Sequence, residues 1–137
     1  MGLFDMFKGS NTPLTPKQVL ATSLLFMVAA DGEVDEAELG QLMMVLRGDR
    51  KSLDAAIKYV RNNPLDAFLA EAPQLLDEKQ RLNVLVNLCD SLLADGRAER
   101  SEQALFGRFL QAFQVSEDQF RPYFNAIVVK NDMSVFG

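Results

Sequence analysis

The sequence predicts an all-α fold, a compact bundle of about seven helices. Apolar residues recur at helical spacing through most of the chain, and helix-start and helix-stop signals divide it into segments of helical length. No segment shows the sustained alternation of apolar and polar residues that is typical of a half-buried strand. The 137 residues, 48% of them hydrophobic, suffice for one buried core. We therefore expect a single helical domain.

This predicted domain covers residues 16–130, with a tail and linker at 1–15 and a second tail at 131–137. In the first tail, Leu3, Met6 and Phe7 would share one face of a short helix. We expect these residues to dock on the domain or to fray. The alternative is a weak anchor for a membrane or a partner, because one short apolar segment has only marginal membrane affinity.

The helices of the first half are defined by their end signals. Thr15 and Gln18 have the spacing of a capping box, with Pro16 at the first helical position. The helix that they start is apolar nearly all round, so we expect it at the centre of the bundle. The predicted helices span about 16–30, from Asp35 to Gly48, about 52–61, and a short stretch after Pro64.

The second half predicts three more helices, at about 74–94, about 99–113 and from Ser116 onward. Pro122 lies too deep in the last helix for a first turn and should kink this helix or delay its start. The apolar side chains of this helix expected to point inward are Phe120, Tyr123, Phe124, Ile127 and Val128.

Two acidic loops repeat along the chain. Residues 30–38 read ADGEVDEAE, and residues 94–102 read ADGRAERSE. Asp, Gly and two later acids recur at a constant offset of 64 residues (95 minus 31). Self-similarity at a fixed offset is the usual sign of an internal repeat. We therefore predict two helix hairpins related by a pseudo-two-fold axis.

The acids of these loops have two explanations. Asp35 with Glu38, and Glu99 with Glu102, suit the positive N-termini of the following helices. Capping does not explain Asp31, which lies where a helix ends and a negative charge opposes the dipole. A divalent cation would relieve the repulsion among the five carboxylates of the first loop. The candidate ligands are Asp31, Glu33, Asp35, Glu38, Asp95, Glu99 and Glu102.

Oxygen ligands predict a hard cation, Ca²⁺ or Mg²⁺, and the spacing is not that of an EF-hand. In the second loop, Arg97 and Arg100 replace acids of the first. Either Arg97 neutralises the second loop without an ion, or Arg97 or Arg100 bridges the two acidic clusters.

Composition restricts the classes of function. The net charge of −5 makes nucleic acid an unexpected partner and favours cations or basic protein surfaces. With no His and one Cys, a Cys/His zinc site within one chain is excluded, and Cys89 is expected to be a small core residue. No catalytic constellation is evident, so we do not expect an enzyme. The lone cysteine and the absence of a signal peptide favour a cytoplasmic protein, with weak membrane association left open.

The stretch ADGEVDEAEL at residues 30–39 resembles the TerB tellurite-resistance family, and is similar to the TerB-like module of some membrane-anchored DnaJ-type co-chaperones. The resemblance extends over about residues 16–130 and includes the later Ala-Asp-Gly and the close of the aromatic helix. It implies a compact helical domain whose two acidic motifs bind a divalent cation. By position it implicates Asp31, Asp35, Glu38, Asp95 and Glu102. Arg97 and Arg100 depart from the acidic pattern, which weakens the case for a second metal.

Two functional hypotheses follow. The first is a non-enzymatic domain that binds a divalent cation and acts in a tellurite- or stress-resistance assembly with protein partners. The second is a metal-free acidic adaptor, membrane-associated through residues 1–8. The sequence leaves the oligomeric state open.

Overall fold

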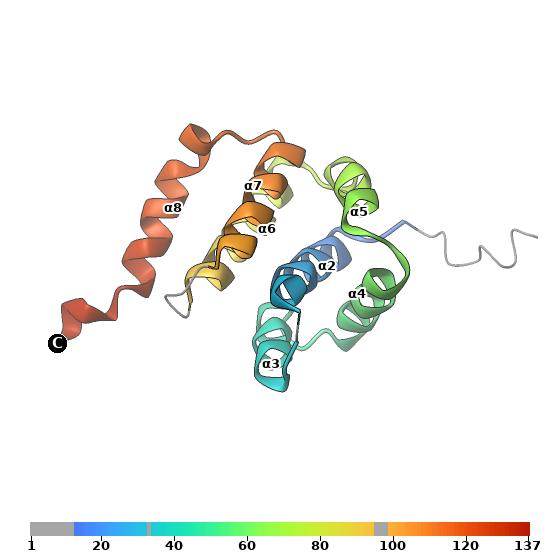
Figure 1. Cartoon of the computed structure of the whole chain (residues 1–137), viewed down its shortest axis with the longest axis horizontal. Coiled ribbons are helices and arrows are strands. Elements are labelled where there is room, and N and C mark those ends of the chain that lie inside the picture. Colours follow the sequence, from blue (N-terminus) through green and yellow to red (C-terminus); the bar gives the residue numbers. More distant parts are fainter. Residues whose placement is uncertain (1–12, 33, 95–98) are drawn as a thin grey trace, which may run out of the picture.

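The computed structural model describes residues 13–32, 34–94 and 99–137 (Figure 1). All regular structure in these ranges is helical, which confirms the predicted all-α bundle. The α-helices are α2 (Pro16–Val28), α3 (Glu36–Val45), α4 (Arg50–Asn62), α5 (Leu65–Glu71), α6 (Glu78–Leu93), α7 (Arg100–Ala112) and α8 (Glu117–Asn131). Short 3₁₀ turns follow three of them: η1 (Ala29–Asp31), η2 (Ala72–Leu75) and η3 (Met133–Phe136).

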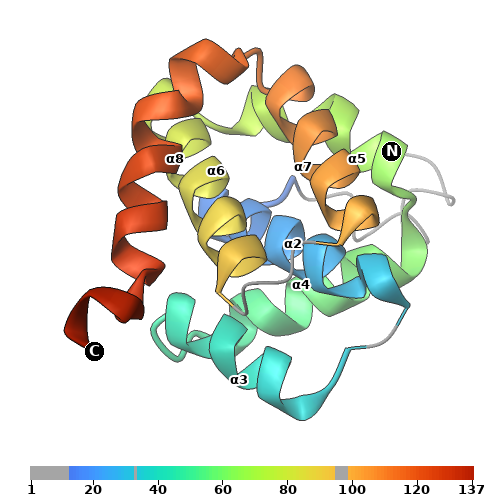
Figure 2. The ribbon, with the colours of Figure 1, turned by 60° about the vertical axis from the view of Figure 1, so that its left-hand side comes forward.

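Helix α2 lies at the centre of the bundle, as its apolar sequence predicts. It packs against α3, α4, α6 and α7, and Figures 1 and 2 show these helices around it. Two polar residues of α2 are buried: Thr22 and Ser23 donate to the carbonyls of Gln18 and Val19, each at 2.7 Å. These hydroxyl groups avoid the cost of unpaired burial by bonding one turn back along their own helix.

Aromatic rings join the remaining helices to this centre. Phe68 of α5 is fully buried, and its ring contacts those of Phe26, Tyr59 and Phe109, from α2, α4 and α7. Phe109 in turn makes an edge contact with Phe113, at 5.8 Å between ring centroids. Rings at such distances stabilise a core beyond the area that they bury. One short helix therefore holds three others together.

In the two predicted hairpins, α2–α3 and α6–α7, the second helices α3 and α7 begin and end in the same way. Asp35 and Glu99 are the N-caps of α3 and α7, 64 residues apart (99 minus 35). At the other end, Arg47 and Gln114 both adopt a left-handed conformation after the helix, with φ of 56° and 59°. These two residues are 67 apart (114 minus 47), because α7 has 13 residues and α3 has 10. The repeat therefore extends beyond the loops, with three residues added in the second helix.

Two details of the second half differ from the prediction. Helix α6 begins at Glu78, not near residue 74, because Pro73 lies in the 3₁₀ turn η2 and Asp77 forms the capping box. Of the two predicted effects of Pro122, a kink or a delayed start, the delayed start is wrong, because α8 begins at Glu117, directly after its cap Ser116.

The predicted inward face of α8 is only partly buried. Phe120 and Ile127 are buried, whereas Tyr123, Phe124 and Val128 are each more than two-fifths exposed. The prediction was wrong for these three because α8 lies at the edge of the bundle, with α6 as its main neighbour. The apolar stripe of α8 is therefore wider than the surface that covers it.

Asp49 links the starts of α2 and α4. Its carboxylate caps α4 by accepting from the Ser52 N–H at 3.1 Å and the Ser52 hydroxyl at 2.9 Å, and it pairs with Lys17 of α2 at 3.1 Å. These contacts, the Ser52 backbone bond first, lower the pKa of Asp49 from 3.8 to about 2. A lowered pKa in the folded state means that the carboxylate stabilises the fold above pH 3.8, and that this contribution is lost as the pH falls through about 2.

We therefore expect the stability advantage of the native chain over Asp49→Asn to shrink as the pH falls from 4 to 2. Urea unfolding at several pH values measures this difference. Lys17→Met is the control and should keep most of the pH dependence, because the ammonium is a smaller cause than the Ser52 bonds. Parallel pH profiles for the native chain and Asp49→Asn would contradict this assignment.

Candidate acidic site

The first acidic motif forms the start of α3. Asp35 has an extended backbone, with φ of −94° and ψ of 173°, and its Oδ1 accepts from the Glu38 N–H at 2.7 Å. Asp35 is exposed, and Glu38 is half-buried on the first turn of the helix. An acid at the N-cap followed by two more in the first turn matches the positive end of the helix dipole.

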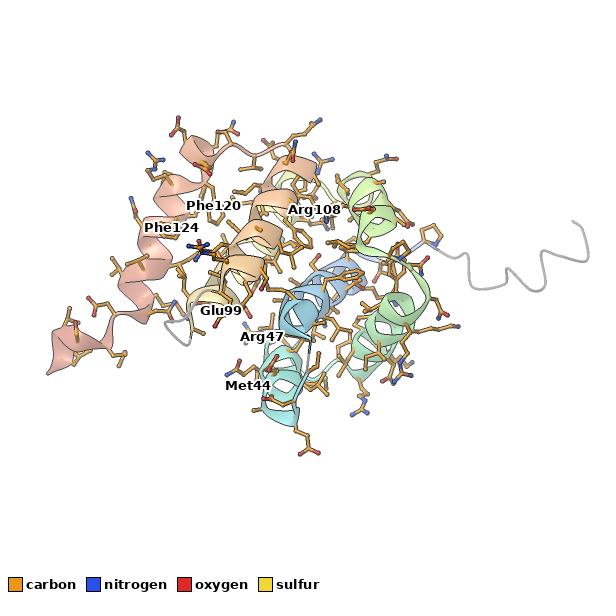
Figure 3. The ribbon with its side chains drawn as sticks, viewed as in Figure 1. Met44, Arg47, Glu99, Arg108, Phe120 and Phe124 are labelled. Atoms are coloured by element: carbon orange, nitrogen blue, oxygen red, sulfur yellow. The ribbon has the colours of Figure 1, made fainter. Side chains whose placement is uncertain are left out.

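The second motif forms the start of α7 in the same manner. Glu99 is the N-cap, and its side chain and that of Glu102 form a capping box, in which the Glu99 N–H donates to Glu102 Oε1 at 3.2 Å. Figure 3 shows Glu99 at the lower end of α7, on the side of the bundle where α3 lies. The predicted capping roles of Asp35, Glu99 and Glu102 are therefore confirmed.

The fold brings these two helix starts together at one small cavity. Asp35 and Glu38 of α3 line it with Glu102 of α7, and its volume is about 290 Å³. The turn η1, which leads into the first loop, also packs against α7. Residues of the two motifs therefore meet although they lie more than 60 positions apart in the chain.

The other predicted ligands either lie outside the described residues or are not seen to line this cavity. Glu33 and Asp95 lie outside the described residues, as do Arg97 and the predicted internal neutralisation of its loop. Asp31 is the last residue of η1, and only its backbone is described. Gly32 follows it with φ of 100°, the left-handed conformation that favours glycine and turns the chain toward α3. Glu99 is described and does not line the cavity.

Sequence reasoning missed two polar groups at this cavity, Gln41 and Ser91. Gln41 follows Glu38 by three residues, so helical spacing could have placed it on the same face of α3. Ser91 of α6 gave no local signal, because its position depends on how α6 packs beside the two loops. In the described ranges, the structure has no group of three Asp, Glu or Cys side chains that could hold a metal ion.

Cys89 belongs to the core, as predicted. Its thiol is buried in α6, and burial followed by the nearby Asp90 carboxylate raises the pKa of Cys89 to about 11. At neutral pH the group is a protonated thiol, which is a poor nucleophile and a poor metal ligand. The cysteine therefore adds no reactive group to the acidic cavity.

The comparison with protein families gives one match. The family model described as tellurite resistance protein TerB matches residues 17–123, well over half of the chain. The chain belongs to the TerB family. Its matched region runs from the first turn of α2 into α8 and includes both acidic motifs. Neither the curated proteins nor the solved structures contain a match.

The membrane hypothesis rests on residues 1–8, which lie outside the described part of the chain. In the part that is described, no helix combines the length and the apolar character needed to cross a bilayer.

Proposed function

We propose that this TerB domain binds a divalent cation, Ca²⁺ or Mg²⁺, where the starts of α3 and α7 meet, and that it acts as a non-enzymatic component of a tellurite- or stress-resistance assembly. The observation that carries the proposal is the shared cavity lined by Asp35, Glu38 and Glu102. Carboxylate oxygens are the ligands that both ions prefer.

The capping bonds are compatible with such an ion. A carboxylate has two oxygens and about four lone-pair sites, so one oxygen can accept a backbone N–H while the other contacts a cation. An ion held by both motifs would require the side chains of Asp35, which is exposed, and of Glu38 and Glu102, which are half-buried, to change conformation. Asp31, Glu33 and Asp95, which flank the same turns in sequence, supply further candidate ligands.

Binding, not catalysis, is the role that this donor set supports. The chain has no His, and its one thiol is buried with a raised pKa. An ion held here would join the two hairpins and make the loops between their helices more rigid.

A metal-free acidic adaptor is the second candidate. It is favoured by the capping bonds themselves, which account for Asp35, Glu99 and Glu102 without an ion. The exposed acids at both helix starts would then contact a basic protein surface. Such binding would survive a chelator and weaken in high salt, because exposed charges are screened at high ionic strength.

Calorimetric titration with CaCl₂ and with MgCl₂ tests the first proposal. We expect heat of binding from the native chain, and at an ion concentration a hundredfold above Kd about 2.7 kcal/mol of added stability, or a rise in Tm of roughly 5–10 °C. The double variant Asp35→Asn with Glu102→Gln should lose at least tenfold in affinity. Asn and Gln preserve the helix caps, so the fold is retained.

The matched control is Glu117→Gln with Asp118→Asn, which removes two charges from the first turn of α8, away from the cavity. This control should bind the ion as the native chain does. Absence of both heat and a shift in Tm at millimolar ion in the native chain would overturn the cation proposal and leave the adaptor.

A further inference from the structure

The end of α8 and the turn after it expose an unusual number of large apolar side chains. Val129 is 75% exposed, Met133 67%, Val135 70% and Phe136 80%. We call Met133–Phe136, which form η3, the apolar tail. Isolated apolar residues are normal on protein surfaces, but a run of this size marks a surface that contacts something.

A groove suited to apolar side chains lies beside the start of this tail. It has a volume of about 320 Å³ and is lined by residues of α2, α3, α6 and α8. Its polar lining includes Asp90, Lys130 and Glu38, and Glu38 also lines the acidic cavity. Its buried lining includes Leu24 and Leu42, and its rim carries Met44 and Val45, which are 76% and 36% exposed. Figure 3 shows Met44 on α3 at the lower edge of the bundle. We call this cavity the α3 groove.

The tail is directed away from the groove of its own chain. Lys130 lines the groove, and its Nζ contacts both Asp90 oxygens at 3.0 Å, while Asn131 donates to the same carboxylate at 2.9 Å. Asp132 then caps η3 by accepting from the Ser134 N–H at 3.1 Å. These bonds fix the end of α8 and the direction of η3, and Figures 1 and 2 show η3 leading outward from the bundle.

We propose that the apolar tail of one copy of this chain inserts into the α3 groove of a second copy, in a symmetric dimer. Each copy carries both a projecting apolar element and, at the same end of the bundle, a groove whose lining is partly apolar. In a dimer with two-fold symmetry, each tail fills the groove of the other copy, so both tails and both grooves are buried together.

The volumes are compatible. A cavity of about 150 Å³ accommodates a benzene ring, so the groove of about 320 Å³ has room for the Phe136 ring and one further side chain. Insertion of the ring would bury it against Leu24, Leu42 and Met44. No other element of the described chain covers these exposed side chains.

The area is also sufficient for a dimer. Taking roughly 100 Å² for a fully exposed large apolar side chain, the four exposed residues of the tail region with Met44 and Val45 expose on the order of 400 Å² per copy. Two copies contribute about twice this area, and interfaces are typically about 60% apolar, which implies a total of roughly 1,300 Å². Specific interfaces begin at about 1,200 Å². We therefore expect a dimer of modest affinity, formed at tens of micromolar chain.

Sedimentation equilibrium of the full chain, in a buffer containing a chelator, tests the dimer independently of cation binding. The native chain should be dimeric at about 100 μM, and raising NaCl should leave the dimer intact, because its contacts are apolar. Phe136→Asp in the tail and Met44→Asp in the groove should each weaken the dimer at least tenfold. Val34→Asp, at an exposed valine outside both surfaces, should not.

Cross-linking identifies which chain receives the tail. Chains carrying Phe136→Cys are mixed with chains carrying Met44→Cys and treated with diamide as the oxidant. A disulfide between the two kinds of chain supports the proposal, and the buried Cys89 does not compete. A native chain that is monomeric at 100 μM, or the absence of a disulfide between the two kinds of chain, would overturn it.

Discussion

Replacing Phe68 with alanine is expected to lower the free energy of unfolding by about 3–5 kcal/mol. The ring is fully buried and contacts Phe26, Tyr59 and Phe109. Its removal therefore leaves a cavity where α2, α4, α5 and α7 meet. The loss combines the transfer free energy of the ring with the contacts that its neighbours lose.

Urea unfolding followed by circular dichroism measures this loss. Phe124→Ala removes the same atoms from a side chain that is 41% exposed, and it should cost less than half as much. If Phe68→Ala is too unstable to yield a baseline, Phe68→Leu should show a smaller loss of the same sign. Equal losses for Phe68→Ala and Phe124→Ala would show that the aromatic cluster does not hold the helices together.

Enlarging Ala56 to leucine is expected to destabilise the domain by about 1–3 kcal/mol. Helix α4 packs against α2 more extensively than any other pair of helices in the described chain. Ala56 and Ala21 are both fully buried, and small side chains allow two helices to approach closely. A larger side chain at this position must displace α4 or adopt a strained rotamer.

The neighbouring Ala55→Leu provides the control. Ala55 lies on the same helix and is only partly buried, so the change in helix propensity is the same but the added side chain can extend toward solvent. We expect it to change the free energy of unfolding, measured with urea, by less than about 0.5 kcal/mol. A loss for Ala55→Leu as large as that for Ala56→Leu would indicate that packing between α2 and α4 is not the cause.

The helix starts could be predicted because their signals are local. Thr15 with Gln18, and Ser116 with Gln119, form two capping boxes, and the two residues of each box lie within one helical turn of each other. Each box satisfies backbone N–H groups that no other part of the helix can reach. The central position of α2 could also be predicted, since a helix that is apolar on all sides must be surrounded.

The inward face of α8 could not be predicted in the same way. Its apolar stripe indicates that one face is buried, but the width of the covered part depends on the neighbouring helices. Lys130 and Asn131 bind Asp90 of α6 and hold α8 at the edge of the bundle, with Tyr123 and Phe124 partly exposed. Asp90 lies about 40 residues before Lys130 and Asn131 in the chain, so no local sequence pattern predicts these contacts.

For the candidate site, the sequence identified the acids but not their neighbours. The 64-residue repeat predicted that Asp35 and Glu99 occupy equivalent positions, and both are N-caps. The sequence did not show that Glu102 shares a cavity with Asp35 and Glu38, or that Glu99 lies outside it. It also did not show that Gln41 and Ser91 line the cavity. These features depend on how α7 and α6 pack against the first hairpin.

By itself, then, the sequence determined the helices, their caps, the repeated acidic turns and the resemblance to the TerB family. These features depend on hydrogen bonds and side-chain periodicity within a few residues of each other. The tertiary structure alone decided which helix starts meet, which apolar side chains stay exposed on α8 and η3, and where a groove remains beside them. Those features depend on contacts between distant segments, and only the packed bundle brings such segments together.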